Sequence, residues 1–472
     1  MQHLTSVAWR SAALVATAAL TVVAACSSSP ASGPPGSLRG ADGGTAAESG
    51  PAGARLRCTA GVPKAFGPAP AAWKLPAARC QTEFDALASS STKLTWRVLS
   101  LATVEAPPLV VAKDACDDAV GVTHWDVYAV TGEGYAVSPR SFSLPAPRCQ
   151  TSFDAFGKQT EKLHYVVLDL DADGRLDLVV TKDACDPQVG VTRWDLYVGA
   201  EEGFARAPSA WTLPAARCKD PFDSIAHAGA VRYSLLDLDG DDRRSLVVTK
   251  DACDAEIGTK RWDVYRTAGK GFAATPAPFA LPAARCTVPF DAVAGTSEVV
   301  FGLLDLTADR KPDLVVTKDA CGPELGVKRW DVYPNRGEGF DPKPLSYGLP
   351  AARCKAAFDG FAGSGAVTYA LLDLSCDQRP ELVVSHDECD AEIGASHWDL
   401  YQGGGGGFVL APSALALPAG RCQSRWDALS SQATVHHAVA SLDTRDAALL
   451  VTKDGCDDAA GASRWDRYPA VK

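Results

Sequence analysis

The stretch that decides the fold is residues 231–282, VRYSLLDLDGDDRRSLVVTKDACDAEIGTKRWDVYRTAGKGFAATPAPFALP. Short apolar runs in it are separated by Asp, Gly and Pro, a pattern typical of strands and hairpins and not of helices. It predicts four strands, at 233–239, 246–250, 261–265 and 272–281. This unit of about 68 residues recurs along the chain.

A Trp-Asp pair marks the period of the repeat. The tryptophans are spaced 69, 68, 68, 68 and 67 residues apart, at Trp125, Trp194, Trp262, Trp330, Trp398 and Trp465. The 472 residues exceed what one compact core usually holds. Six four-stranded copies predict an all-β fold, a six-bladed β-propeller.

The two ends of the repeated region each carry part of a copy. Residues 55–76 align without a gap with 193–214, the last part of a copy, and the sixth copy stops at Lys472 before a fourth strand. We therefore expect 65–75 to pair with 465–468, so that an N-terminal strand completes the last blade and removes an open sheet edge. The propeller is predicted to span 55–472.

Fifteen cysteines indicate an oxidising compartment, because twelve of them recur as one pair per copy. We expect disulfides within each copy, Cys80–Cys116, Cys149–Cys185, Cys218–Cys253, Cys286–Cys321, Cys354–Cys389 and Cys422–Cys456. A shifted register, beginning with Cys116 to Cys149, is the alternative. Zinc lacks both C-x2-C spacing and histidine partners here. Cys58 and Cys376 are left for a seventh bond.

The N-terminus has the proportions of a signal peptide. Arg10 precedes an apolar run too short to span a bilayer comfortably, and Val23-Ala24-Ala25-Cys26 resembles the bacterial lipobox. The resemblance implies cleavage after residue 25, lipid on Cys26 and, because Ser27 follows, sorting to the outer membrane or cell surface. An ordinary cleavage site is the alternative. Residues 26–54, rich in Ser, Pro, Gly and Ala, predict a disordered tether.

The second copy contains VLDLDADGRLDLVV at 167–180, followed by RWDLY at 193–197 and EGF at 202–204. These residues resemble the FG-GAP/VCBS repeats of integrin-α-like propellers. The resemblance implies a calcium ion in the acidic turn, and alternate carboxylates with a glycine suit one hard cation. The expected ligands are Asp169, Asp171, Asp173 and Asp177, with the carbonyl of Arg175, and in the third copy Asp237, Asp239 and Asp241. The alternative is a solvated turn without an ion.

Two further patterns recur in the copies. Lys-Asp and Trp-Asp occur in nearly every copy, which indicates a structural pairing and not a catalytic site. Aromatic residues precede the Leu-Pro of five copies, and we predict that Trp73 and Trp211 stack on a sugar. Packing against the adjacent strand is the alternative.

A formal net charge of −11 disfavours nucleic acid as a partner. No nucleophile–base set, phosphate loop or paired catalytic carboxylate stands out, so we expect no enzyme. The prediction is a monomeric, lipid-anchored binding module that recognises a polysaccharide or an envelope protein through repeated, similar sites. An architectural envelope protein and a propeller-type polysaccharide lyase or glycosidase remain alternatives.

Overall fold

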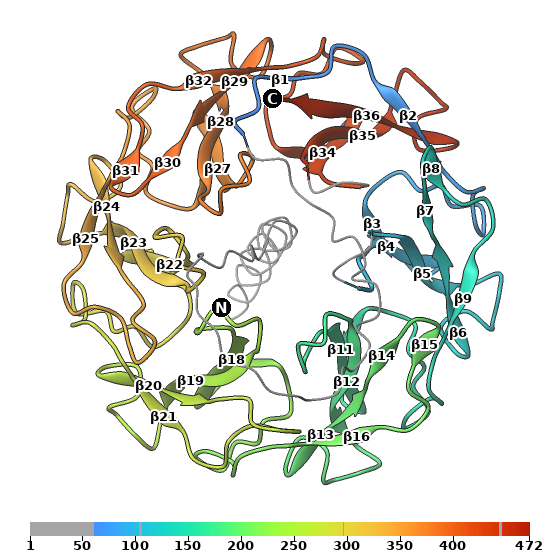
Figure 1. The fold of residues 1–472 in the computed structure, drawn as a ribbon, viewed down its shortest axis with the longest axis vertical. Coiled ribbons are helices and arrows are strands. Elements are labelled where there is room, and N and C mark those ends of the chain that lie inside the picture. Colours follow the sequence, from blue (N-terminus) through green and yellow to red (C-terminus); the bar gives the residue numbers. More distant parts are fainter. Residues whose placement is uncertain (1–60, 103–105, 296, 443–445) are drawn as a thin grey trace, which may run out of the picture.

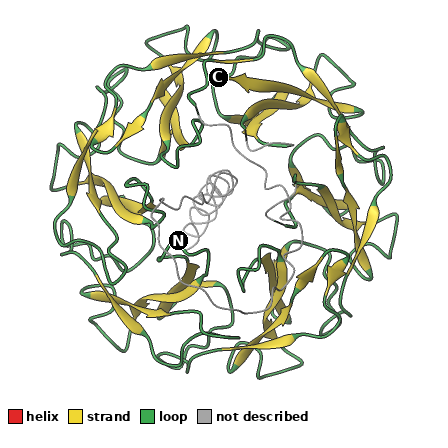
Figure 2. Cartoon of the chain, in the orientation of Figure 1, coloured by secondary structure: helices red, strands yellow, loops and turns green. Residues whose placement is uncertain are grey.

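The structure is a computed structural model that describes residues 61–102, 106–295, 297–442 and 446–472. Within these ranges the chain forms strands and no helix, and the sheets are arranged as a ring around a central axis (Figures 1 and 2). The fold is therefore all-β and propeller-like. The predicted signal peptide, Cys26, the tether and Cys58 lie outside the described residues.

Four strands recur in each copy. The first strands are β4 (Leu94–Val98), β11 (Leu163–Leu168), β18 (Val231–Leu236), β22 (Val299–Leu304), β27 (Val367–Leu372) and β34 (Val435–Ala440). The second are β5 (Leu109–Asp114), β12 (Asp177–Asp183), β19 (Ser245–Asp251), β23 (Asp313–Asp319), β28 (Glu381–Asp387) and β35 (Ala448–Asp454). The third are β6 (His124–Tyr128), β13 (Arg193–Tyr197), β20 (Arg261–Tyr265), β24 (Arg329–Tyr333), β29 (His397–Tyr401) and β36 (Arg464–Val471). The outermost are β9 (Arg140–Ser143), β16 (Ser209–Thr212), β21 (Ala277–Ala280), β25 (Leu345–Gly348), β32 (Ser413–Ala416) and β2 (Ala71–Lys74).

Shorter strands extend these sheets at both sides. On the side of the first strands lie β3 (Ala88–Ser90), β10 (Gly157–Gln159), β17 (Ala226–Ala228), β26 (Ala362–Gly363) and β33 (Ser430–Gln432). Short hairpins follow three of the third strands, as β7 (Val130–Thr131) with β8 (Gly134–Tyr135), β14 (Gly199–Ala200) with β15 (Gly203–Phe204), and β30 (Gly403–Gly404) with β31 (Gly407–Phe408). The remaining strand is β1 (Ala65–Phe66).

The third copy shows how closely the pattern predicts the strands. β18, β19 and β20 match the expected runs to within three residues at each end. The fourth strand is shorter than expected, because Pro276 has no N–H to donate and β21 begins only after it. Pro278 lies within β21, which is tolerated because β21 ends its sheet.

The N-terminal strand β2 pairs with β36, as the alignment of the two ends predicts. The pairing is antiparallel and places Trp73 opposite Trp465. β1 also contacts β36, through Ala65 opposite Val471, and runs parallel to β32. β36 is longer than the predicted run because it accommodates both N-terminal strands. The first and last parts of the repeated region are thus hydrogen-bonded to each other.

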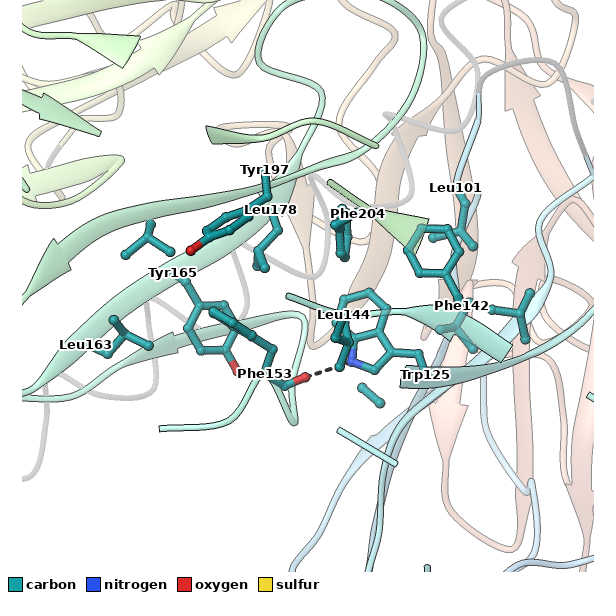
Figure 3. Packing of buried hydrophobic residues seen from close by; sticks show 14 of the residues in the cluster. Leu101, Trp125, Phe142, Leu144, Phe153, Leu163, Tyr165, Leu178, Tyr197 and Phe204 are labelled. Atoms are coloured by element: carbon teal, nitrogen blue, oxygen red, sulfur yellow. Dashed lines mark hydrogen bonds between the residues drawn. The ribbon is translucent and has the colours of Figure 1, made fainter. Parts of the chain in front are cut away.

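Buried aromatic and aliphatic side chains fill the space between neighbouring sheets. In Figure 3 the indole of Trp125 lies against Phe142 and Phe204, and its Nε1 donates to the carbonyl of Phe153 at 2.7 Å. Phe153 lies in the connection, the segment between the outermost strand of one copy and the first strand of the next. In every other copy the equivalent tryptophan donates to the same place in the connection that follows it, as Trp194–Phe222, Trp262–Phe290, Trp330–Phe358, Trp398–Trp426 and Trp465–Phe84. The last bond joins the sixth copy to the first connection. The tryptophan that marks the sequence period therefore attaches each copy to the next one.

A glycine is required where neighbouring copies meet. Gly258 has φ +88°, and a Cβ there would lie 2.6 Å from the carbonyl oxygen of Thr249 and 2.7 Å from the Cβ of Asp291. Any larger residue would push the two copies apart.

Among the described residues, no helix is long and apolar enough to cross a membrane.

Candidate functional site

Six disulfides each join the connection that precedes a copy to the loop between the second and third strands of that copy. The structure contains the within-copy bonds and not the shifted ones, at Cys80–Cys116, Cys149–Cys185, Cys218–Cys253, Cys286–Cys321, Cys354–Cys389 and Cys422–Cys456. Each closes a loop of about 35 residues. Cys376 is also disulfide-bonded. Its expected partner, Cys58, lies outside the described residues. With their sulfurs in disulfides, the recurring cysteines are not available as thiolate ligands.

Beside each disulfide lies a cluster around a buried pair of aspartates, which we call the arginine lock. In the third copy Arg217 donates through Nε to Asp251 and through Nη1 to Asp263, both at 2.8 Å, and also reaches the hydroxyl of Tyr265 at 3.0 Å. Both carboxylates are buried. The lock recurs around Arg79, Arg148, Arg285, Arg353 and Arg421. The recurring Asp of Lys-Asp and of Trp-Asp is therefore structural, as the repetition predicts.

In four copies the lysine of Lys-Asp forms an ion pair with an aspartate of the connection to the next copy. Lys250 lies 2.8 Å from Asp291, in the connection that follows. Equivalent pairs are Lys182–Asp223, Lys318–Asp359 and Lys453–Asp85, and in the fifth copy His386 faces Asp427 at 3.7 Å. These partly exposed pairs hold neighbouring copies in register and are modest in energy.

The acidic turn of the second copy connects β11 to β12. One oxygen of Asp169 accepts from the N–H of Gly174, whereas its Oδ1 is buried and, in the described part of the chain, has only the N–H of Ala172 near it, without a hydrogen bond of good geometry. Asp177 is fully buried and accepts from the N–H groups of Leu170 and Gly199. Asp171 completes the acidic side of the turn. The buried Oδ1 of Asp169, which lacks a good hydrogen bond, is therefore suited to bind a cation.

The electrostatics of this turn also favour a cation. Burial raises the pKa of Asp169 and Asp171, and the charge of Asp173 raises both further. Burial raises the pKa of Asp177 to about 7. Carboxylates in this position repel one another when charged, and a calcium ion would remove that repulsion. The residues of the second copy thus fit calcium.

The third copy does not fit calcium in the same way. The guanidinium of Arg266, at the end of β20, forms an ion pair with Asp239. Both oxygens of Asp237 accept from backbone N–H groups, Oδ1 from Gly240 and Oδ2 from Asp242, whereas Oδ1 of the equivalent Asp169 is without a hydrogen bond in the described residues. Because an arginine already neutralises one expected ligand and Ser245 replaces the last, the expected set of Asp237, Asp239 and Asp241 is not assembled for an ion.

The expectation that Trp73 and Trp211 stack on a ligand is wrong, because both rings are buried. They are 3% and 1% exposed. A short hairpin of the following copy covers each outermost strand, so that Trp73 contacts Tyr135 and Trp211 contacts Phe272. The alternative, in which these aromatic rings pack against an adjacent strand, is confirmed.

A hollow of about 400 Å³ lies between the innermost strands of the first copy and the connection into the second. We call it the first-copy hollow. It is bordered by Ala88, Ser89, Ser90, Trp96, Arg97 and Phe156, with Thr95, Ala155 and Gly157. No carboxylate, histidine, lysine or tyrosine is among these residues, so the hollow offers one cation and no acid–base pair.

Arg97 departs from the repeat. Its pairing register places it opposite Val110, and the equivalent positions hold Val166, Ser234, Gly302, Ala370 and Ala438. The repeat pattern does not identify Arg97, because a pattern of recurring residues gives no weight to a residue that occurs in one copy alone. A column-by-column alignment of the six copies would have found it, as the one charged residue in a column of small or apolar ones.

No family model matches the chain, and no curated protein matches it. Among solved structures, it is similar to that of an Agrocybe aegerita lectin that recognises non-reducing terminal N-acetylglucosamine. The identity is 15% over 80% of this chain and 81% of that one, with a TM-score of 0.41. It is also similar to a PL25 ulvan lyase (11%, covering 89% and 95%, TM-score 0.30) and to the Dos1 propeller (8%, covering 84% and 95%, TM-score 0.25). At these TM-scores, the activities and ligands of those proteins are not transferred to this chain.

Proposed function

We propose that the protein is a non-catalytic binding module of the cell envelope that recognises a polysaccharide. It would be a closed six-bladed propeller of the FG-GAP/VCBS kind at 55–472, monomeric and carried on the tether 26–54. Lipid on Cys26 would hold it at the outer membrane or cell surface. The signal-peptide pattern and the six disulfides, which suit an exported protein, support this location.

One observation carries the proposal. In every copy the arginine, two aspartates and tyrosine that could serve chemistry are joined in the same lock. Catalysis needs an asymmetric set with separate acid, base or nucleophile roles. The first-copy hollow contains Arg97, which the other copies lack, but it has no acid–base pair. A cation, hydroxyls and the aromatic ring of Phe156 suit recognition.

Closure of the ring is supported by two contacts between the ends of the repeated region. β2 pairs with β36, and Trp465 donates to the carbonyl of Phe84 at 2.6 Å. Deleting 55–76 should uncover the edge of β36 and cause aggregation. Deleting 30–54 in the tether is the control and should leave the melting temperature unchanged. If the first deletion also leaves it unchanged, the ring does not depend on the N-terminal strand.

Calcium is proposed for the second copy alone. Asp169, Asp171, Asp173 and Asp177 would hold the ion, which would supply positive charge to the turn and order it. The buried Oδ1 of Asp169, which lacks a good hydrogen bond, supports this assignment, and the ion pair of Arg266 argues against the third copy.

The function is tested by measuring the binding of the purified protein to immobilised polysaccharides and envelope proteins. Retention on at least one polysaccharide class, with no release of reducing or unsaturated sugar ends, is the expected result. Turnover of any polysaccharide would overturn the non-enzyme proposal. Binding to no polysaccharide would overturn the choice of ligand.

A further inference from the structure

The first-copy hollow contains an arginine without an anionic partner. Arg97 makes no ion pair within the described residues, whereas the arginines of the locks, such as Arg79 and Arg148, each pair with aspartates. Its guanidinium lies over the ring of Phe156, with the central carbon 5.7 Å from the ring centroid. It is exposed at the rim of the hollow, yet the surrounding protein desolvates it enough to lower its pKa. An exposed guanidinium without a counter-ion in the described residues is available to pair with an anionic ligand.

The surroundings of Arg97 add two kinds of contact. The ring of Phe156 presents an apolar surface next to the cation. Ser90 carries a hydroxyl on the face of the sheet that holds Arg97, because Arg97 lies opposite Ala88, two residues earlier on the same strand. That strand is β3, which lies at the inner end of its sheet (Figure 1). An edge strand also has backbone N–H and C=O groups that no further strand uses. Together these groups suit a ligand that carries an anion, a C–H face and several hydroxyls.

We propose that the first-copy hollow binds an acidic saccharide whose carboxylate is held by Arg97. A guanidinium presents a planar fork that matches the two oxygens of a carboxylate. The C–H face of a hexuronate ring would lie on Phe156, and its hydroxyls would face Ser90 and the backbone edge of β3. The volume of about 400 Å³ is within the range of small-molecule sites. This inference rests on the proposed function and names its substrate class.

The overall charge makes this selectivity testable. A formal charge of −11 repels polyanions in general. Retention of a polyanion by this chain therefore requires a local cation, and removing that cation should abolish retention.

The chain itself offers variants that should fold. Other copies carry alanine in place of Arg97, at Ala370 and Ala438, so Arg97→Ala places a residue that this strand accepts elsewhere. Phe156→Leu copies Leu87 and Leu429, the equivalent residues of two other connections. Arg206→Ala removes the same charge from an exposed loop without a partner in the described residues, and serves as the control.

The experiment measures binding of full-length protein to polygalacturonate, dextran and dextran sulfate by affinity electrophoresis. We expect selective retention by polygalacturonate, at least a tenfold loss in Arg97→Ala, a smaller loss in Phe156→Leu and no change in Arg206→Ala. Equal binding of Arg97→Ala and wild type would overturn the inference, as would equal retention by dextran sulfate.

Two outcomes separate this inference from the proposed function. If the protein binds dextran, and Arg97→Ala binds it equally, the saccharide-binding function stands and the acidic ligand is wrong. If the protein binds no polysaccharide, both are wrong. Circular dichroism of each variant checks that a loss of binding is not a loss of fold.

Discussion

Arg217 and Arg97 belong to copies of the same repeat and have opposite surroundings. Arg217 is joined to Asp251, Asp263 and Tyr265, and the same cluster occurs in every copy. Arg97 has no anionic partner among the described residues, and its position in the other copies holds a small or apolar residue. The comparison teaches that what repeats in this molecule maintains the fold. We therefore expect ligand recognition at a residue such as Arg97, which departs from the repeat.

Breaking the lock should have the largest effect. Arg217→Ala removes the arginine from two buried carboxylates, of Asp251 and Asp263. Within the described residues, these keep only the N–H of Cys253 and the side chain of Arg261 as donors. Removing one partner of a buried pair costs about 3–5 kcal/mol. Arg97→Ala should change the free energy of unfolding by less than about 0.5 kcal/mol, as is usual for exposed positions. Urea denaturation of both variants measures the contrast. Equal losses would show that the two arginines do not differ in role.

A second prediction compares the buried acid at the start of β28, Glu381, with the serine at the start of β19. Burial raises the pKa of Glu381 to about 7. A group whose pKa is higher in the folded state binds its proton more tightly there, so its contribution to stability is complete below pH 4 and is lost as pH rises toward 7. Glu381→Gln should be more stable than wild type at pH 8, by up to about 3 kcal/mol, and nearly unchanged at pH 4.

The third copy supplies the control for this prediction, because Ser245 occupies the equivalent position and cannot titrate. Ser245→Ala should shift the free energy of unfolding equally at pH 4 and pH 8. A difference between Glu381→Gln and wild type that does not change with pH would contradict the assignment.

Calcium should give a smaller effect, and only through the second copy. At a free concentration about thirty times Kd, the ion would stabilise the fold by about 2 kcal/mol, seen as a higher melting temperature than in chelator. Asp171→Ala should remove this gain. Asp239→Ala should not, because Arg266 already pairs with Asp239. A chelator that leaves the wild-type melting curve unchanged would contradict the site.

Sequence periodicity predicts the strands well, because each short run is bounded by Gly, Asp or Pro and recurs six times. It also predicts the pairing of β2 with β36 and the partners of each disulfide, since a repeat places equivalent residues in equivalent positions. Two features lay beyond it. The burial of Trp211 depends on a hairpin from the next copy, which no single copy reveals. Arg97 departs from the pattern, so periodicity does not identify it.

Hydrogen exchange with and without polygalacturonate tests the central claim most directly, because it distinguishes one unique site from six repeated ones. We predict that the polymer protects the backbone of 88–97 and 155–157 and leaves the equivalent residues 226–234 of the third copy unchanged. Protection spread equally over the equivalent strands of all copies would contradict the claim that recognition lies where the repeat is broken.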